Sequence, residues 1–177
     1  MRNSVANWDL HPTLFGSVEL FRRGRAPLAR AFAGVYHCGM NVNLEAIVQL
    51  FVKKEKRDRM ITLAGKPSRR PDLRHDLLHD TRSLDPAVMT RLADGLTVDA
   101  IAKALRAASS SGARAYCISE VIDANDQESS VSDALRAVVG RAQDSLVFVI
   151  GTRAAYYENH DGEQYILQSR GPGAVRS

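Results

Sequence analysis

The feature that most constrains the fold of this chain lies in its C-terminal third. Residues 146–150, Leu-Val-Phe-Val-Ile, form a continuous apolar and largely β-branched run. Such a run is typical of a strand buried on both faces, because a half-buried strand alternates apolar and polar side chains. Two further apolar segments, 154–157 and 164–167, flank Asn-His-Asp-Gly at 159–162, where Asp-Gly favours a type I′ turn. The sequence therefore predicts a central strand followed by a hairpin over 154–167.

Helical spacing of apolar residues predicts a first helix upstream. It is expected to start near Cys38 or Asn41, to run to about Arg59, and to bury Ile47, Leu50 and Phe51. Residues 65–80 contain one glycine and two prolines among many basic residues, which predicts a basic loop ending in a helical turn.

Three polar residues are expected to cap helices in the middle of the chain. Asp85, followed by Pro86, predicts a helix start. Thr97 caps a predicted helix over 98–106 whose Ile101, Ala104 and Leu105 share a face, and Ser130 caps another over 131–142. A strand is predicted between these two helices, over 115–121.

These elements predict an α+β fold over residues 1–177. We expect a single domain in which N-terminal and middle helices pack on a late antiparallel sheet of about four strands. An irregular lead-in over 1–31 and a flexible tail over 171–177 are expected at the two ends.

The composition indicates the class of protein and where in the cell it is expected. A chain of 177 residues, 45% hydrophobic and 25% charged, is typical of one globular domain. No apolar run approaches the roughly 18 residues of a membrane span, and residues 1–4 lack the apolar stretch that is expected of a signal peptide. Two cysteines are too few for a disulfide scaffold. We therefore expect a cytoplasmic protein, in the producing cell or in a host, with no membrane partner; the sequence does not indicate its oligomeric state.

Positive charge is concentrated between residues 53 and 74. This stretch holds nine basic and three acidic residues, a local excess that is larger than the chain's net charge of +4. Arg69, Arg70 and Arg74 are therefore predicted to form a surface for a protein partner. Nucleic acid is the less favoured partner, because aromatic residues do not interleave with the basic ones. The alternative is a solvated helix end followed by a loop.

Cys38 is the candidate nucleophile. It stands in Tyr-His-Cys-Gly at 36–39, just before the first predicted helix. A thiol near a helix N-terminus lies at the positive end of the helix dipole, which lowers its pKa and raises its reactivity. The alternative is a buried cysteine that packs as a small apolar side chain.

This pattern resembles the papain-like cysteine protease superfamily. The segments that carry the resemblance are 36–39, the glycine-led helix over 95–105 and the terminal hairpin within 146–170. The nearest similarities within the superfamily are to phytochelatin synthases, bacteriocin-processing peptidases and compact deubiquitinases or deamidases. The resemblance implies a cysteine-dependent hydrolase or transferase acting on peptide, isopeptide or glutamine amide bonds, with Cys38 as nucleophile.

The chain departs from that family at the other catalytic positions. The family's histidine falls on Thr152 or Arg153 here, and its acid falls on Gln168. An arginine stays protonated and cannot serve as a general base. The departures favour a non-catalytic relative that binds a protein partner, such as a pathogen or viral protein engaging its host, with Arg153 and Gln168 in the binding groove near Cys38. Catalysis through Cys38 is the alternative function.

Other residues offer further interpretations. His160, beside the predicted turn, is the alternative catalytic histidine. His75 and His79 are four residues apart and would share a helix face as metal ligands do, but the sequence shows no third ligand beside them. We therefore predict no metal and no cofactor. Residues 92–105 also resemble the first helix of a helix-turn-helix, although a serine-rich segment and then a predicted strand follow it.

Overall fold

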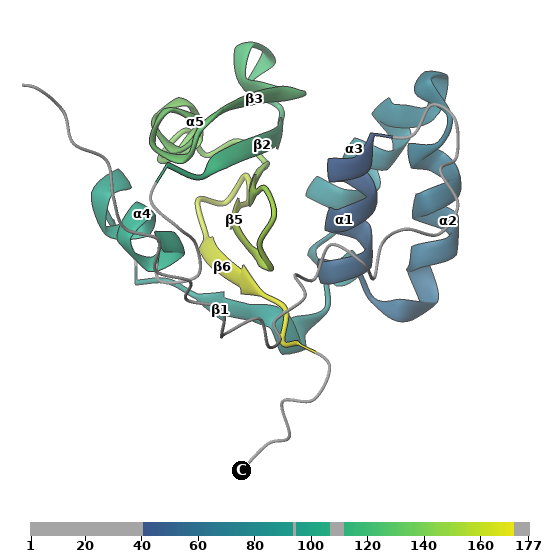
Figure 1. The fold of residues 1–177 in the computed structure, drawn as a ribbon, viewed down its shortest axis with the longest axis horizontal. Coiled ribbons are helices and arrows are strands. Elements are labelled where there is room, and N and C mark those ends of the chain that lie inside the picture. The colour runs from purple at the N-terminus through teal and green to yellow at the C-terminus, as the bar shows by residue number, and fades with distance from the viewer. Residues whose placement is uncertain (1–40, 94, 107–111, 172–177) are drawn as a thin grey trace, which may run out of the picture. The chain divides into compact units, whose positions relative to one another are not determined.

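The computed structural model describes residues 41–93, 95–106 and 112–171. These residues form a six-stranded antiparallel sheet. Helices lie on both faces of the sheet (Figure 1). The strand order is β1-β6-β5-β4-β2-β3. The predicted α+β class is therefore confirmed. The strands are β1 (Met89–Arg91), β2 (Arg114–Ser119), β3 (Gln127–Ser130), β4 (Ser145–Val149), β5 (Ala154–Glu158) and β6 (Gln164–Gln168). The helices are α1 (Val42–Phe51), α2 (Lys54–Ala64), α3 (Arg70–Leu78), α4 (Val98–Arg106) and α5 (Val131–Val138).

The expected number of about four strands was too low. The two strands that the sequence did not reveal, β1 and β3, are the edge strands of the sheet. Both are short, and most of their residues are exposed, so neither carries an apolar pattern. Strand β4 is central and buried along its whole length, as the continuous apolar run predicts.

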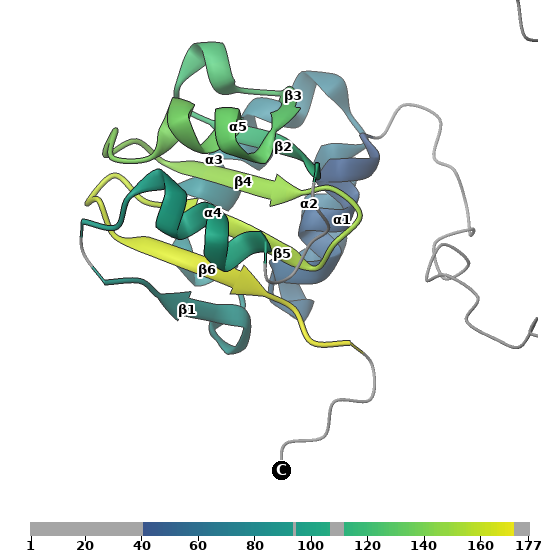
Figure 2. The ribbon, with the colours of Figure 1, turned by 60° about the vertical axis from the view of Figure 1, so that its left-hand side comes forward.

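Each face of the sheet has its own core. Helices α1, α2 and α3 cover one face, and α4 and α5 cover the other (Figure 2). Successive residues of β4 point to opposite faces: Leu146 and Phe148 belong to the first core, and Val147 and Val149 to the second. Both faces of the central strands are therefore apolar. None of the helices in the described residues is long and apolar enough to cross a membrane.

The first predicted helix is two helices. Asn41 is the N-cap of α1, since its Oδ1 accepts the Asn43 N–H at 2.9 Å. The helix ends at Phe51 because Val52 is extended and forms a β-bridge with Leu84. The predicted buried face is confirmed for Ile47, Leu50 and Phe51. Cys38 and the lead-in over 1–31 lie outside the described residues, as does the tail beyond residue 171.

The basic loop predicted over 65–80 is wrong. These residues form a 3-10 helix (Pro67–Arg69) and then α3. Pro71 lies in the first turn of α3, where a missing N–H costs no hydrogen bond. The side of α3 that faces the sheet is buried and consists of Leu73, Leu77 and Leu78.

The predicted caps are confirmed, but the helix lengths are not. Asp85 accepts the Ala87 N–H at 2.9 Å, yet only a 3-10 turn (Pro86–Val88) follows before β1. Thr97 accepts the Ala100 N–H at 3.3 Å and caps α4, whose Ile101 and Leu105 are buried, whereas Ala104 is exposed. Ser130 caps α5, which ends at Val138 rather than 142.

Helix α4 does not have the surroundings of a DNA-reading motif. Its buried side chains, Ile101 and Leu105, belong to the core that α4 and α5 form on the sheet. The next element in the described part of the chain is the strand β2, so no recognition helix directly follows α4 there.

Candidate functional site

Three strand ends and one helix end meet at one edge of the sheet. Ser119 at the end of β2 pairs with Ser145 at the start of β4, and Ser145 pairs with Glu158 at the end of β5. Glu120 and Asp144 therefore lie side by side just beyond their strands, and the Glu120 N–H donates to the Asp144 carbonyl at 3.0 Å. This edge of the sheet is where polar side chains of several segments converge.

The C-terminal end of α3 is attached to the same edge. The Tyr157 hydroxyl, on β5, donates to the Leu78 carbonyl at 2.5 Å and is buried. Burial of the hydroxyl is the main reason that the pKa of Tyr157 is raised above its ordinary value, so it stays a hydrogen-bond donor. His79, the next residue, is thereby held against the sheet.

The Asn-His-Asp-Gly turn brings the second histidine to this edge. The Gly162 N–H donates to the Asn159 carbonyl at 2.9 Å, and the Asn159 N–H donates to Glu163 at 3.1 Å. Gly162 has a φ of +77°, but His160 and Asp161 are not among the residues with positive φ. The hairpin is confirmed, but its turn is not type I′, because the three-residue loop needs only one left-handed residue, at Gly162.

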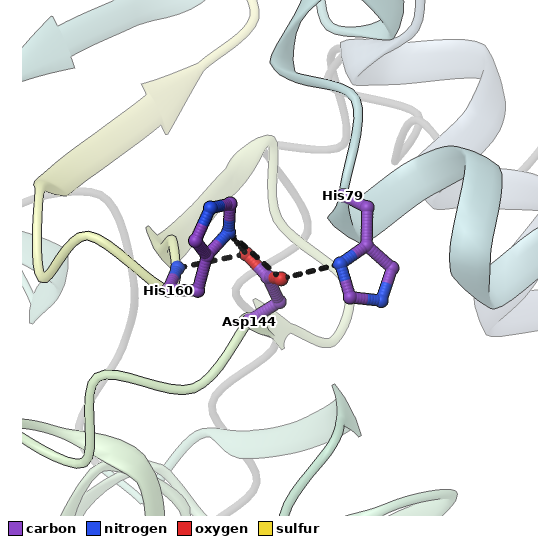
Figure 3. Close-up of side chains that lie close together, drawn as sticks. All are labelled: His79, Asp144 and His160. Atoms are coloured by element: carbon purple, nitrogen blue, oxygen red, sulfur yellow. Dashed lines mark hydrogen bonds and ion pairs between the residues drawn. The ribbon is translucent and has the colours of Figure 1, made fainter.

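Asp144 is the centre of the site. Its side chain is 0% exposed. The backbone N–H of His160 donates to Oδ1 at 3.0 Å, His79 Nδ1 lies 2.7 Å from Oδ2, and His160 Nδ1 lies 3.3 Å from Oδ2. Figure 3 shows the two imidazole rings on either side of the carboxylate. A buried carboxylate is thus held by two imidazoles and one backbone amide in the described part of the chain.

His79 lies between two carboxylates. Its Nδ1 is 2.7 Å from Asp144, and its Nε2 is 2.9 Å from Glu120 Oε1. A neutral imidazole has one N–H and one lone pair, so it can donate to only one of the two. If Nε2–H donates to Glu120, the Nδ1 lone pair faces a carboxylate oxygen. A cation between Nδ1 and Asp144, either a proton or a metal ion, resolves that repulsion.

The donor set suits a transition-metal ion. Ligand atoms of His79, Asp144 and His160 all lie within 4.8 Å of one another. In a tetrahedral zinc site, metal–ligand distances of about 2.0–2.2 Å place ligand atoms about 3.3 Å apart. The separation of 3.3 Å between His160 Nδ1 and Asp144 already matches, and His79 would have to move outward by about half an ångström from its hydrogen-bonded position. Glu120 would then be the outer carboxylate that orients a metal-bound imidazole.

A pocket of about 290 Å³ opens beside His79. Its walls come from α3, which contributes Arg74 and His75, from His79 just after that helix, and from the segment after β2, which contributes Glu120, Ile122 and Asn125. The His75 ring lies 4.6 Å from the His79 ring, measured between centroids. The predicted sharing of one helix face by His75 and His79 is therefore confirmed. Solvent reaches the site from a second side as well, because the His160 side chain is 59% exposed.

The histidines predicted from the sequence fall in this site, but their partner was missed. His160 was predicted as a catalytic alternative, and His79 as half of a metal pair without a third ligand. The structure instead groups His79 with His160 and with Asp144, which no motif marks, and His75 is not part of this group. The signal that could have found Asp144 is an acidic residue immediately before a strand that is buried on both faces, since such a position is buried too.

Arg153 and Gln168 lie at the other end of the hairpin. Gln168 pairs with Ala154, and the Ser169 N–H donates to the Arg153 carbonyl at 3.0 Å. The two strand ends that hold these residues therefore lie side by side. Arg153 precedes β5 whereas His160 follows it, so the two belong to opposite ends of that strand. Cys38, the predicted nucleophile, lies outside the described residues, and its role stays a prediction.

The three arginines predicted to bind a partner lie on the 3-10 helix before α3 and on α3 itself. Arg69 is exposed and forms an ion pair with Asp72. Arg70 is half-buried, and Arg74 is half-buried and lines the pocket beside His79. The protein partner of this stretch stays a prediction.

The second cysteine has a structural role. Cys117 is buried in β2. Burial raises the pKa of its thiol to about 12, so the reactive thiolate is not formed near neutral pH.

Comparison of the chain with protein-family models, with curated proteins and with solved structures finds no match. The resemblance to the papain-like superfamily therefore stays a prediction.

Proposed function

We propose that this protein binds a divalent transition-metal ion, with Zn²⁺ as the best fit, through His79, Asp144 and His160. The observation that carries the proposal is the position of His79 between Asp144 and Glu120, at 2.7 and 2.9 Å. Neutral imidazole donates to only one of these carboxylates, and a buried carboxylate is costly unless hydrogen bonds or a cation satisfy it.

Zn²⁺ suits this donor set better than the hard cations. Imidazole nitrogen is a common ligand of zinc and of other late first-row metals, whereas Mg²⁺ and Ca²⁺ take oxygen ligands. Three protein ligands leave one position of a tetrahedral ion for water or substrate, as in catalytic zinc sites. An ion in such a site polarises a bound oxygen and lowers the pKa of bound water. The proposed site is therefore of the kind that supports hydrolytic chemistry.

Metal titration of the purified chain tests the proposal. Stripped protein is titrated with Zn²⁺ by calorimetry, and Co²⁺ is used as a spectroscopic probe of coordination geometry. We expect one ion per chain and a tetrahedral Co²⁺ spectrum. His160→Gln should weaken Zn²⁺ binding at least tenfold, because it removes one of three ligands from an exposed position that folding does not need.

His75→Gln is the matched control. It removes an imidazole from the same helix face and the same pocket but not from the proposed ligand set. We expect Zn²⁺ affinity to change by less than about threefold, the range left by a residue outside both the ligands and their hydrogen-bond partners. Equal losses in the two variants, or no saturable binding to the unchanged chain, would contradict the proposed site.

A further inference from the structure

The pocket beside His79 continues along α3. A second pocket, of about 300 Å³, shares Pro71, Arg74 and Asn125 with the first. The two together form a depression between α3 and the segment after β2, and their combined size is that of a small-molecule site. His79 lies in the first pocket and Arg70 lines the second, so Arg74 is between the proposed metal site and the far part of the depression.

Arg74 differs from Arg59 and Arg69. Arg59 pairs with Asp76 at 2.7 Å, and Arg69 pairs with Asp72. Arg74 is half-buried, and no carboxylate or other hydrogen-bond acceptor contacts it in the described residues. A partly desolvated guanidinium with its donors unused favours an oxyanion, which it can hold by two parallel hydrogen bonds.

The acidic residues of the depression already have partners. Glu120 contacts His79, and Asp126 accepts a hydrogen bond from the Tyr116 hydroxyl. Asn125 accepts the Ser119 N–H through its Oδ1 at 3.2 Å, which leaves its amide N–H donors unused in the described residues. The groups still available to a ligand in the shared wall are therefore donors, those of Arg74 and Asn125.

We infer that the ligand of this site is a small molecule bearing a carboxylate or phosphate group, which Arg74 and Asn125 bind while another part of the molecule reaches the metal ion. The inference rests on the proposed metal site, since His79 and Arg74 line the same pocket. The metal ion and the guanidinium are two positive centres at one depression, and both attract an anionic ligand.

Anion titration of the Co²⁺-loaded protein tests this inference. Inorganic phosphate and acetate are titrated separately, with calorimetry for affinity and the Co²⁺ absorption spectrum for contact with the metal. Arg74→Gln should weaken binding of the preferred anion at least tenfold, because it removes the charge and the paired donors. Arg74→Lys should give a smaller loss, since it keeps the charge but not the planar fork. The anion that binds tighter identifies the group as phosphate or carboxylate.

Arg69→Gln is the control, because Arg69 lies in the same basic stretch, is paired with Asp72 and lines neither pocket. We expect no change in anion affinity. If Co²⁺ still binds but the anion affinity is equal in the unchanged chain and in Arg74→Gln, the inference is overturned. Loss of the Co²⁺ spectrum in the unchanged chain would instead overturn the proposed metal site, so the two failures are distinguishable.

Discussion

Two carboxylates are buried at the same edge of the sheet, and they are satisfied in different ways. Glu158, 1% exposed, accepts hydrogen bonds from the N–H groups of Gly140 and Ala142 at 3.0 and 3.1 Å and from the Tyr156 hydroxyl at 2.6 Å. Asp144 is as deeply buried, but its side-chain partners are the imidazoles of His79 and His160.

The difference separates a structural anion from a candidate functional one. The partners of Glu158 are backbone amides and a tyrosine whose pKa is raised above its ordinary value, chiefly by burial, so they stay neutral donors. These hydrogen bonds to Glu158 hold the loop between α5 and β4 in place. The donor groups neither take up a proton near neutral pH nor bind a metal. The imidazoles beside Asp144 can bind a metal ion. Burial of a carboxylate alone therefore does not mark a site; the chemistry of its partners does.

Removing Glu158 should have the largest effect on stability. Glu158→Ala leaves three donors without their acceptor, and we expect the free energy of unfolding to fall by about 3 kcal/mol. Urea denaturation of the metal-free protein measures this loss. Glu158 variants that retain the fold should still bind Zn²⁺. A fall in the free energy of unfolding of less than about 1 kcal/mol would mean that water replaces the carboxylate.

Zinc should stabilise the chain through Asp144 and not through Glu158. At a free Zn²⁺ concentration 100 times the dissociation constant, the free energy of unfolding should rise by about 2.7 kcal/mol. Asp144→Asn should abolish most of this increase, because the amide is a poor ligand for zinc, whereas Glu158→Gln should retain it. An equal increase in both variants would place the metal elsewhere.

Substitutions of the two buried tyrosines of β5 should have smaller effects on stability, and only one of them should affect Zn²⁺ binding. Tyr156 bonds to Glu158, and Tyr157 bonds to the Leu78 carbonyl beside His79. Each Tyr→Phe change should cost about 1–2 kcal/mol, the usual value for one lost hydrogen bond to a charged or backbone acceptor. Only Tyr157→Phe should also weaken Zn²⁺ binding, because it releases the end of α3. Equal Zn²⁺ affinities in the two variants would contradict the positioning role of Tyr157.

An exposed carboxylate next to the site should have the smallest effect. The hydrogen bond from Lys56 lowers the pKa of Asp80 from its ordinary value of 3.8. The stabilisation is therefore present above pH 3.8 and is lost as the pH falls through the lower, folded-state value. Asp80→Asn should cost less than about 0.5 kcal/mol at pH 7, because the side chains of Lys56 and Asp80 are 37% and 43% exposed, and less than that at pH 2. Thermal unfolding at both pH values measures the difference; a larger loss at pH 2 would reverse the predicted sign.

The local parts of this structure were accessible from the sequence. The central strand, the hairpin, the caps Thr97 and Ser130 and the buried face of α1 follow from apolar periodicity and from short-range hydrogen bonds. Two of the errors have one cause. The first predicted helix is divided because Val52 forms a bridge with Leu84, and the short edge strands exist only because the sheet provides a partner. Each of these features depends on a contact distant in sequence.

The sequence by itself determined the central strand, the hairpin and the buried face of α1, that the sheet is antiparallel and that His75 and His79 share a helix face. Only the tertiary structure decided that His79, Asp144 and His160 meet. Their segments are a helix end, a pre-strand loop and a hairpin turn, and each has an ordinary local reason for its polar residues. They become a site because strand register aligns β2, β4 and β5 at one edge and buries Asp144 there. Burial removes the water that would otherwise satisfy the carboxylate, so its partners must be supplied by the fold.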